Sequence, residues 1–223
     1  MFPAFKAVIF DMDGLVLDTE AAYIFAWRLA AEFMGYQLDD SFCNSLSGLH
    51  GEAVEQQLLR LCGQDFNLQH FKSLSGEYWR SHVQELGVPV KKGFNSLLQL
   101  LNERELPYAL ATNSRRRAAL DCLLLAGLGE VFPNLITRDE VAAGKPAPDI
   151  FLQAAAVMGF EAGECLVLED SAVGIAAAVA AGCPCLYVPS LYPADEWAAG
   201  KALAVVEDLE QAAEFILSAL LLK

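Results

Sequence analysis

Residues 7–14 join an apolar run directly to an acidic segment, Ala7-Val8-Ile9-Phe10 and then Asp11-Met12-Asp13-Gly14. A short, uninterrupted apolar run is typical of a strand that a parallel sheet buries on both faces. Thr112 follows a second run of this kind, and Glu169-Asp170 ends a third. In open α/β sheets the ligand site lies at the carboxyl ends of the strands. The polar residues are therefore expected to meet at one edge of a sheet.

The pattern of the chain changes twice. Between Thr19 and about Leu86 no strand pattern appears, and apolar residues recur at helical spacing. After Pro89, short apolar runs alternate with helical segments, which indicates βαβ units and a parallel sheet. We therefore predict an α/β fold with a doubly wound, Rossmann-like core formed by residues 1–15 and 90–223. An all-helical cap domain, residues 16–89, is inserted after the first strand.

The apolar runs and helical spacings also predict the individual core elements. Strands are predicted over residues 5–11, 108–112, 134–137, 166–169 and 185–188. Helices are predicted over residues 94–104, 115–126, 149–158, 172–181 and 208–222.

The composition argues against several classes of protein. Although 55% of the 223 residues are hydrophobic, no charge-free run approaches the ~18–20 residues of a membrane span. The net charge of −14 disfavours nucleic acid and anionic membranes as partners, so local positive charge must attract any anionic substrate. No signal peptide is recognisable and the six cysteines lie mostly in apolar patterns, so a cytoplasmic protein with reduced thiols is expected. Cys183 and Cys185 could form a metal or redox pair, but no second pair accompanies them.

Asp11 and Asp13 have the spacing of paired catalytic carboxylates. Two residues apart at a strand end, they can direct both carboxylates to one side. One could attack the phosphorus of a phosphate ester to give an aspartyl-phosphate, while the other acts first as an acid and then as a base. The alternative is that the segment is only a metal-binding loop or a turn.

Glu169 and Asp170 are adjacent acids at the end of a predicted strand. Adjacent carboxylates repel each other at a sheet edge unless a cation is bound, and a set of oxygen ligands suits Mg²⁺. A helix N-cap at Asp170 or Ser171 would account for one acid but not for two.

Thr112 and Lys145 are the remaining candidates for catalysis. Thr112 precedes a predicted helix, so its hydroxyl and the nearby amides could bind a phosphoryl group, although Thr is also a common N-cap. Lys145 lies between Gly144 and Pro146, a context that favours a fixed loop. Its ammonium could neutralise Asp11 and a phosphoryl group, whereas a single Lys is more often a solvated surface residue.

Four segments taken together resemble the haloacid dehalogenase superfamily, in the group with a helical cap inserted after the first strand. They are residues 11–20 (DMDGLVLDTE), 112–114 (TNS), 144–151 (GKPAPDIF) and 167–182 (VLEDSAVGIAAAVAAG). The pattern is most similar to β-phosphoglucomutase-like and phosphoglycolate-phosphatase-like proteins.

This resemblance implies a role for each core residue. Asp11 would be the nucleophile and Asp13 the acid and base. Mg²⁺ would be bound by Asp11, by Asp13 through its backbone carbonyl, and by Asp170, with Glu169 adjacent or bound through water. The assignment of Lys145 as the charge-balancing cation depends on the resemblance more than on the local sequence.

Substrate-contacting residues are expected on both parts of the chain, because in this family the cap recognises most of the leaving group. Tyr23 and the loop residues Gly48 and His50 would contact the substrate from the cap. Asn113 and Arg115 could reach it from the core. His50 is equally well explained as a surface residue at a helix start.

The presence of Asp13 distinguishes between activities within the family. Dehalogenase and phosphonatase relatives lack this second aspartate, so phosphate-ester chemistry is favoured here. The leading interpretation is a Mg²⁺-dependent phosphatase of a small phosphorylated metabolite, a sugar phosphate or a phosphoglycolate-like acid, acting as a monomer or weak homodimer. A phosphosugar mutase is the alternative, and a non-catalytic metabolite-binding protein is disfavoured because every catalytic position is intact.

The mutase alternative requires cations for a second phosphate. Mutases similar to β-phosphoglucomutase have a His early in the first cap helix, and a Lys and an Arg beside the cap-loop glycine. This chain has Tyr23, Ser47 and Gly51 where these residues would be expected, and His50 would be only partly charged near neutral pH. A desolvated phosphate without a cation is costly, so net release of phosphate is expected.

Overall fold

The structure is a computed structural model that describes residues 5–46, 51–190 and 193–221. The chain forms two compact units, and each is described by itself. One contains the residues up to Leu17 and those from Pro89 onward, and the other contains residues Asp18–Val88. The predicted boundaries were at residues 15 and 90.

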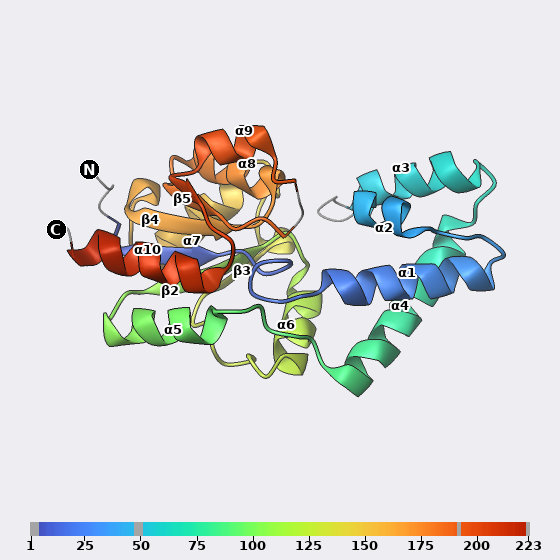
Figure 1. Ribbon diagram of the computed structural model, residues 1–223, viewed down its shortest axis with the longest axis horizontal. Coiled ribbons are helices and arrows are strands. Elements are labelled where there is room, and N and C mark those ends of the chain that lie inside the picture. Colours follow the sequence, from blue (N-terminus) through green and yellow to red (C-terminus); the bar gives the residue numbers. More distant parts are fainter. Residues whose placement is uncertain (1–4, 47–50, 191–192, 222–223) are drawn as a thin grey trace. The chain divides into compact units, whose positions relative to one another are not determined.

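The first unit is built on a six-stranded parallel sheet (Figure 1). The described strands are β1 Ala7–Phe10, β2 Tyr108–Thr112, β3 Leu135–Thr137, β4 Cys165–Glu169, β5 Cys185–Tyr187 and β6 Ala204–Val205. Their order is β3-β2-β1-β4-β5-β6, so the chain proceeds outward from β1 in both directions. Ile9 of β1 lies opposite Ala109 of β2 and Val167 of β4. This doubly wound order confirms the predicted α/β class.

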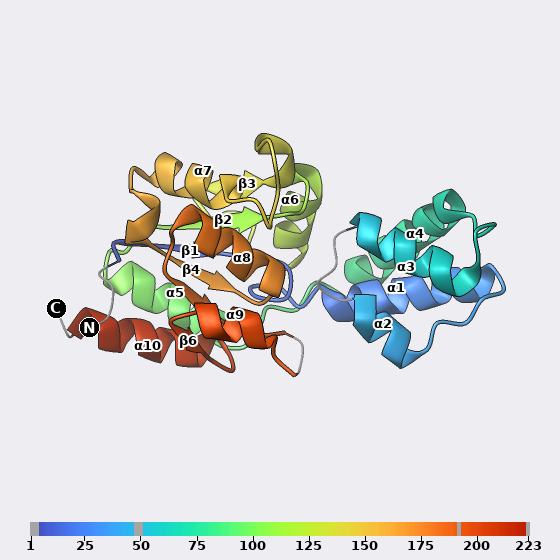
Figure 2. The ribbon, with the colours of Figure 1, turned by 90° about the horizontal axis from the view of Figure 1, so that it is seen from above.

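Helices cover both faces of the sheet (Figure 2). The described helices of this unit are α5 Phe94–Glu103, α6 Arg116–Leu125, α7 Asp149–Met158, α8 Ala172–Ala181, α9 Glu196–Lys201 and α10 Leu209–Leu221. Two short 3₁₀ turns, η1 Arg138–Glu140 and η2 Ala162–Glu164, precede α7 and β4 respectively.

Alternation along β1 supplies a side chain to each face of the sheet. Ile9 packs in a buried cluster with residues of α7 and α8, including Phe151 and Ile175. Phe10 lies on the opposite face, where its ring meets that of Phe94 edge-on at a centroid distance of 5.9 Å. Because β1 is central and buried on both sides, the position of the acidic segment that follows it is well determined.

Besides the two 3₁₀ turns, one strand and one α-helix of this unit were not predicted from the sequence. They are β6, of two residues, and α9, of six residues. Neither is long enough to show a hydrophobic period. The side chain of Asp195 caps α9 by accepting a hydrogen bond from the Ala198 amide at 2.8 Å. All the predicted core strands and helices are present, and their ends differ from the predicted ones by at most two residues.

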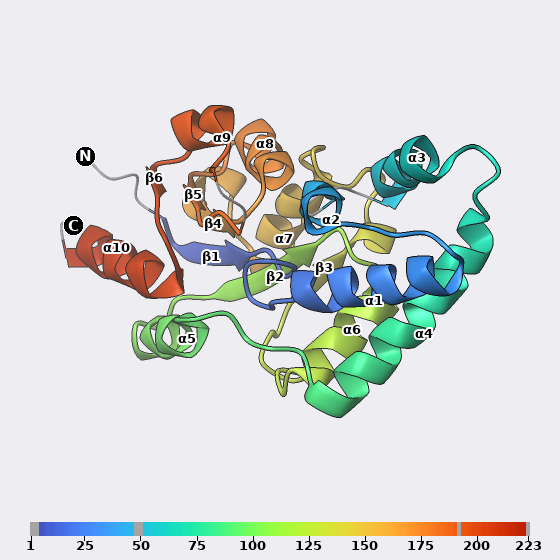
Figure 3. The same ribbon diagram turned by 45° about the vertical axis from the view of Figure 1, so that its right-hand side comes forward.

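The second unit is helical throughout its described residues, with α1 Glu20–Phe33, α2 Asp40–Leu46, α3 Gly51–Cys62 and α4 Leu68–Leu86. Helices α1 and α4 lie side by side (Figure 3). Between them Tyr23 stacks on Trp79 at a ring-centroid distance of 5.6 Å and on Trp27 at 6.0 Å. The N-cap of α1 is Thr19, which makes no side-chain capping bond.

No helix among the described residues combines the length and the apolar character that crossing a membrane requires.

Candidate active site

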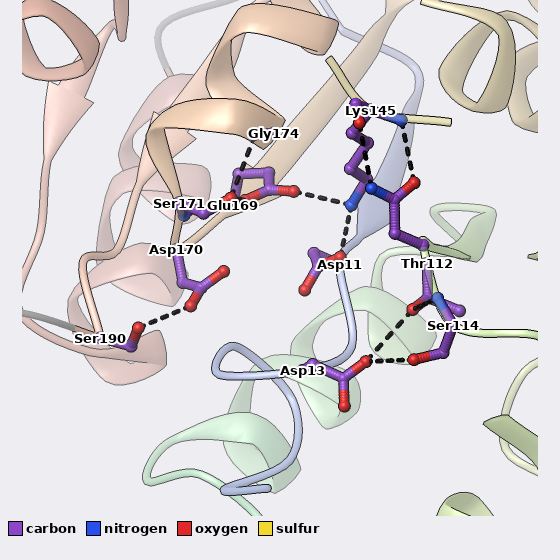
Figure 4. Close-up of polar contacts among 11 residues, drawn as sticks. Asp11, Asp13, Thr112, Ser114, Lys145, Glu169, Asp170, Ser171, Gly174 and Ser190 are labelled. Carbon is purple, nitrogen blue, oxygen red and sulfur yellow. Dashed lines mark hydrogen bonds and ion pairs between the residues drawn. The ribbon is translucent and has the colours of Figure 1, made fainter. Parts of the chain in front are cut away.

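Polar residues from four segments meet at the carboxyl edge of the sheet (Figure 4). Asp11 follows β1, Thr112 ends β2 and Glu169 ends β4, and these three strands are neighbours. Asp170 comes next in the chain, and Lys145 belongs to the loop before α7. All five side chains are buried. Ionisable groups in such a place are costly unless they are paired, so each one's partners matter.

Lys145 forms the charged centre of this group. Its ammonium contacts an Asp11 carboxylate oxygen and donates to Glu169 Oε1 at 2.7 Å. Its Nζ also lies 4.9 Å from the centre of the Phe151 ring, within the range of a cation–π interaction. Burial alone would lower the pKa of Lys145, but the two carboxylates raise it above its ordinary value. Lys145 is therefore a buried cation and not a solvated surface residue.

The surroundings of Asp11 disfavour its charged form, whereas those of Lys145 favour the charged form of the lysine. Burial, together with the nearby carboxylates of Glu169 and Asp13, raises the pKa of Asp11 to about 8, although the Lys145 ammonium acts in the opposite direction. Three carboxylates, those of Asp11, Glu169 and Asp170, share this site with a single ammonium. Additional positive charge is needed to keep Asp11 ionised.

Glu169 is held on both sides. Its Oε1 accepts from Lys145, and its Oε2 accepts from the backbone and the hydroxyl of Ser171, each at 3.0 Å. Ser171 in turn caps α8 by accepting from the Gly174 amide at 3.0 Å. A Cβ atom at Gly174 would lie 1.7 Å from Glu169 Oε1. The first turn of α8 therefore has room for this carboxylate only because residue 174 is glycine.

Like Glu169, Asp170 is held by a serine hydroxyl and accommodated by a glycine. Its Oδ2 accepts a hydrogen bond from Ser190 Oγ at 2.7 Å. A Cβ at Gly14 would lie 2.1 Å from the same oxygen, and Gly14 has a φ of +85°. Both the space and the backbone conformation require glycine here.

A metal ion fits the three carboxylates. Asp11, Glu169 and Asp170 each offer one oxygen, and these oxygens all lie within 4.8 Å of one another. Oxygen-only ligands with surplus negative charge suit a hard divalent cation. The Asp13 carboxylate is not part of this group among the described residues, and whether its backbone carbonyl binds a metal stays a prediction.

The Asp13 carboxylate is directed toward the end of β2. Its Oδ2 accepts from Ser114 Oγ at 2.8 Å and from Thr112 Oγ1 at 3.3 Å. Two hydroxyl groups thus hold this carboxylate in one orientation. Thr112 Oγ1 also accepts from the Ser114 amide at 3.0 Å.

Two of the amides that follow Thr112 have hydrogen-bond partners within the protein. The Ser114 amide donates to Thr112, and the Arg116 amide, in the first turn of α6, donates to Asp139 Oδ1 at 2.9 Å. Arg115 is the N-cap of α6, without a side-chain capping bond, so the N-cap alternative for Thr112 is wrong. Phosphoryl binding by the Thr112 hydroxyl and the nearby amides stays a prediction.

The residues predicted to bind the substrate lie in different parts of the chain. The Asn113 side chain bonds to the backbone of Lys145, and Arg115 is exposed at the start of α6. Tyr23 belongs to the helical unit. Gly48 and His50 lie outside the described residues. Their contacts with a substrate therefore stay predictions.

The structure gives roles to residues for which the sequence predicted no contact with the acidic side chains. They are Ser114, Ser171, Ser190, Gly14 and Gly174. Of these, Ser114, Ser171, Gly14 and Gly174 lie within the motif segments, and the N-cap position considered for Ser171 is confirmed. Ser190 is 20 residues from Asp170, and no local pattern indicates it.

The chain is similar in sequence and structure to known hydrolases and phosphate-transferring enzymes. A family model described as haloacid dehalogenase-like hydrolase matches residues 5–182. The fructose-1-phosphate phosphatase YqaB of Escherichia coli K12 is 32% identical over 182 residues, which cover 82% of this chain and 95% of that protein. The β-phosphoglucomutase of Bacillus subtilis 168 is 27% identical over 183 residues, with 79% and 80% covered. A crystal structure of a HAD family hydrolase from Deinococcus radiodurans R1, with bound phosphate and sodium, has a TM-score of 0.81 and 26% identity, and the match covers 99% of this chain and 98% of that one.

The chain belongs to the haloacid dehalogenase-like hydrolases. The family model matches most of its length, and the resemblance drawn from the sequence motifs is confirmed.

Proposed function

We propose that this protein is a Mg²⁺-dependent phosphatase that hydrolyses a small phosphorylated metabolite through an aspartyl-phosphate intermediate. The observation that carries this proposal is the position of Asp11. Its carboxylate lies at the end of the central strand, in contact with the Lys145 ammonium and close to Glu169 and Asp170. A nucleophilic carboxylate with a fixed cation beside it is what transfer of an anionic phosphoryl group requires.

The reaction begins with attack by an Asp11 carboxylate oxygen on the phosphorus atom. The bond from phosphorus to the ester oxygen breaks, and the phosphoryl group is transferred to Asp11. Asp13 donates its proton to the departing oxygen, which leaves as an alcohol. Asp13 then accepts a proton from a water molecule whose oxygen attacks the phosphorus. Inorganic phosphate is released and the Asp11 carboxylate is regenerated.

The neighbouring residues support these steps in different ways. Lys145 neutralises charge on Asp11 and on the phosphoryl group. The hydroxyl groups of Thr112 and Ser114 orient the Asp13 carboxylate for proton transfer.

Asp11, Glu169 and Asp170 would hold the metal ion, and the family resemblance adds the backbone carbonyl of Asp13. When bound, Mg²⁺ would supply positive charge that offsets the clustered carboxylates and the phosphoryl oxygens.

A phosphorylated sugar is the favoured class of substrate. The relative from Escherichia coli is a fructose-1-phosphate phosphatase, and the matched segment covers most of both chains. A phosphosugar mutase is the second candidate, because the relative from Bacillus subtilis is a β-phosphoglucomutase. Hydrolysis is favoured over isomerisation because Tyr23, an uncharged residue, occurs where a cationic side chain would be expected in a mutase.

The test is a panel of phosphorylated metabolites assayed with Mg²⁺ and again with excess chelator. Released phosphate and isomerised product are measured separately on the same samples. We expect phosphate release from at least one sugar phosphate, no stimulation by a sugar bisphosphate, and loss of activity with chelator. Conversion of β-glucose 1-phosphate to glucose 6-phosphate faster than phosphate release would establish the mutase instead. Full activity in chelator would exclude the metal.

A further inference from the structure

Asn113 forms two hydrogen bonds with the backbone of one residue, Lys145. Its Oδ1 accepts from the Lys145 amide at 2.8 Å, and its Nδ2 donates to the Lys145 carbonyl at 3.1 Å. Both polar ends of the side-chain amide are therefore used. These two bonds join the segment after β2 to a loop that is 32 residues away in the sequence.

The loop fits closely over this amide. A Cβ atom at Gly144 would lie 2.5 Å from Asn113 Oδ1 and 2.5 Å from Arg138 Cδ. Real Cβ atoms are not found at such distances, so residue 144 must be glycine for Asn113 to reach the Lys145 peptide groups. The contact between Asn113 and the Lys145 backbone therefore depends on both segments, through the side chain of Asn113 and the absence of one at Gly144.

The other bonds of the loop do not involve the Lys145 backbone. The Ala143 amide donates to Asp149 Oδ1 at 3.2 Å, and the Ala147 amide donates to the Gly144 carbonyl at 2.9 Å. Among the described residues, the bonds recorded for the Lys145 peptide groups are those to Asn113. The Lys145 side chain extends from this point to Asp11 and Glu169.

We propose that Asn113 is a positioning residue that holds Lys145 in place for phosphoryl transfer. A long, flexible side chain reaches a given point reproducibly only when its backbone is fixed, and a misplacement of about 1 Å in an active site can cost about 100-fold in rate. Asn113 supplies that fixed point, and its two bonds are directional. This role differs from the substrate contact that the sequence suggested, and it rests on the proposed phosphatase function.

The kinetic test compares Asn113→Ala with Asn113→Asp. Alanine removes both bonds, whereas aspartate keeps the acceptor for the Lys145 amide and loses the donor to its carbonyl. By analogy with residues that orient metal ligands, we expect kcat to fall by about 10–100-fold in the alanine variant, with KM changed less than kcat. Asn95→Ala, an exposed position on α5, is the control and should retain full activity.

A double-mutant cycle separates positioning from direct contact with the substrate. If Asn113 acts through Lys145, then Asn113→Ala should change kcat by less than about 2-fold in a Lys145→Ala background. A full 10-fold loss in that background would overturn the proposal, because it would mean that Asn113 acts independently of Lys145.

Amide hydrogen exchange tests the same contact without any turnover. Exchange at the Lys145 amide should be faster in Asn113→Ala than in the native protein, and also in Gly144→Ala, whose added Cβ would displace the Asn113 amide. Asn95→Ala should leave it unchanged. Unaltered exchange at Lys145 in both variants would overturn the proposal. If the native protein releases no phosphate from any metabolite, the proposed function fails while this measurement still decides the role of Asn113.

Discussion

At the scale of single residues, the site combines one ammonium group, that of Lys145, with three carboxylates and therefore carries excess negative charge. Lys145 contacts Asp11 and donates to Glu169, and an oxygen of Asp170 lies close to oxygens of these two carboxylates. Each carboxylate also has its own supporting group, such as Ser171 for Glu169 and Ser190 for Asp170. Substitutions that keep the shape of a side chain but remove its charge or hydroxyl group should therefore show how much that group contributes to activity or metal binding.

Asp11→Asn preserves the shape of the nucleophile and removes its charge. We expect kcat to fall by more than about 1000-fold, because an amide cannot attack phosphorus as the carboxylate does. The melting temperature should not fall, since Lys145 keeps its bond to Glu169 and one of the crowded carboxylates is gone. Activity and thermal unfolding are measured on the same preparation. Near-native activity would contradict the aspartyl-phosphate mechanism.

Ser190→Ala removes the hydroxyl that donates to Asp170 Oδ2. We expect Mg²⁺ to bind about 10–100-fold more weakly, because residues that orient metal ligands have effects of this size. The dissociation constant is measured by titration calorimetry in the absence of substrate. The exposed Ser96→Ala on α5 is the matched control. Equal affinity in both variants would show that Asp170 does not depend on Ser190.

At the scale of elements, the start of α8 has two functions. Ser171 caps the helix and also donates to Glu169, and Gly174 leaves space for that carboxylate. The helix is otherwise rich in alanine and packs closely against the sheet. The position of Glu169 therefore depends on the geometry of one helical turn.

Two glycines within helices allow a matched comparison. Gly174→Ala should lower both activity and melting temperature, because the added Cβ would lie 1.7 Å from Glu169 Oε1. Gly200→Ala in α9 has nothing within 4 Å of the added Cβ. That change should be neutral or stabilise the protein by up to about 1 kcal/mol through helix propensity. Kinetics and thermal unfolding of the pair check the prediction, and similar behaviour of the two variants would refute it.

At the scale of the whole molecule, most cysteine side chains are buried. Cys43, Cys122, Cys165, Cys183 and Cys185 are buried, and Cys62 is half-buried. Burial raises the pKa of Cys122 and of Cys183 to about 12. Cys183 and Cys185 lie in the core of the first unit, as their apolar sequence context predicted, and their reduced state stays a prediction.

Thiol labelling of the folded protein checks this arrangement. Because the thiolate is the reactive form, buried thiols with a raised pKa should react very slowly at pH 7–8. We expect one cysteine per chain, Cys62, to be labelled in the native protein, and all six after unfolding in denaturant. Cys62→Ser should abolish the native reaction. Rapid labelling of several cysteines in the native protein would show that the core opens readily.

The fold class and the acidic residues at the sheet edge could be predicted from the sequence. Apolar runs before Asp11, Thr112 and Glu169 predicted buried strands of one parallel sheet, and parallel strands bring their carboxyl ends to the same edge. The motif order also indicated the family. This information is local, so it could be read without coordinates.

Which side chains contact one another could be learned only from the folded structure. Asn113 bonds to Lys145 across 32 residues, and Ser190 bonds to Asp170 across 20. Such pairs depend on loop conformation, and hydrogen bonds require atoms placed to within a few tenths of an ångström. A short strand such as β6 likewise forms because β5 is beside it, and not because two residues carry a pattern. Residue types and the apolar runs that form strands are local features of the sequence, whereas the partners of the proposed catalytic side chains exist only after the chain has packed.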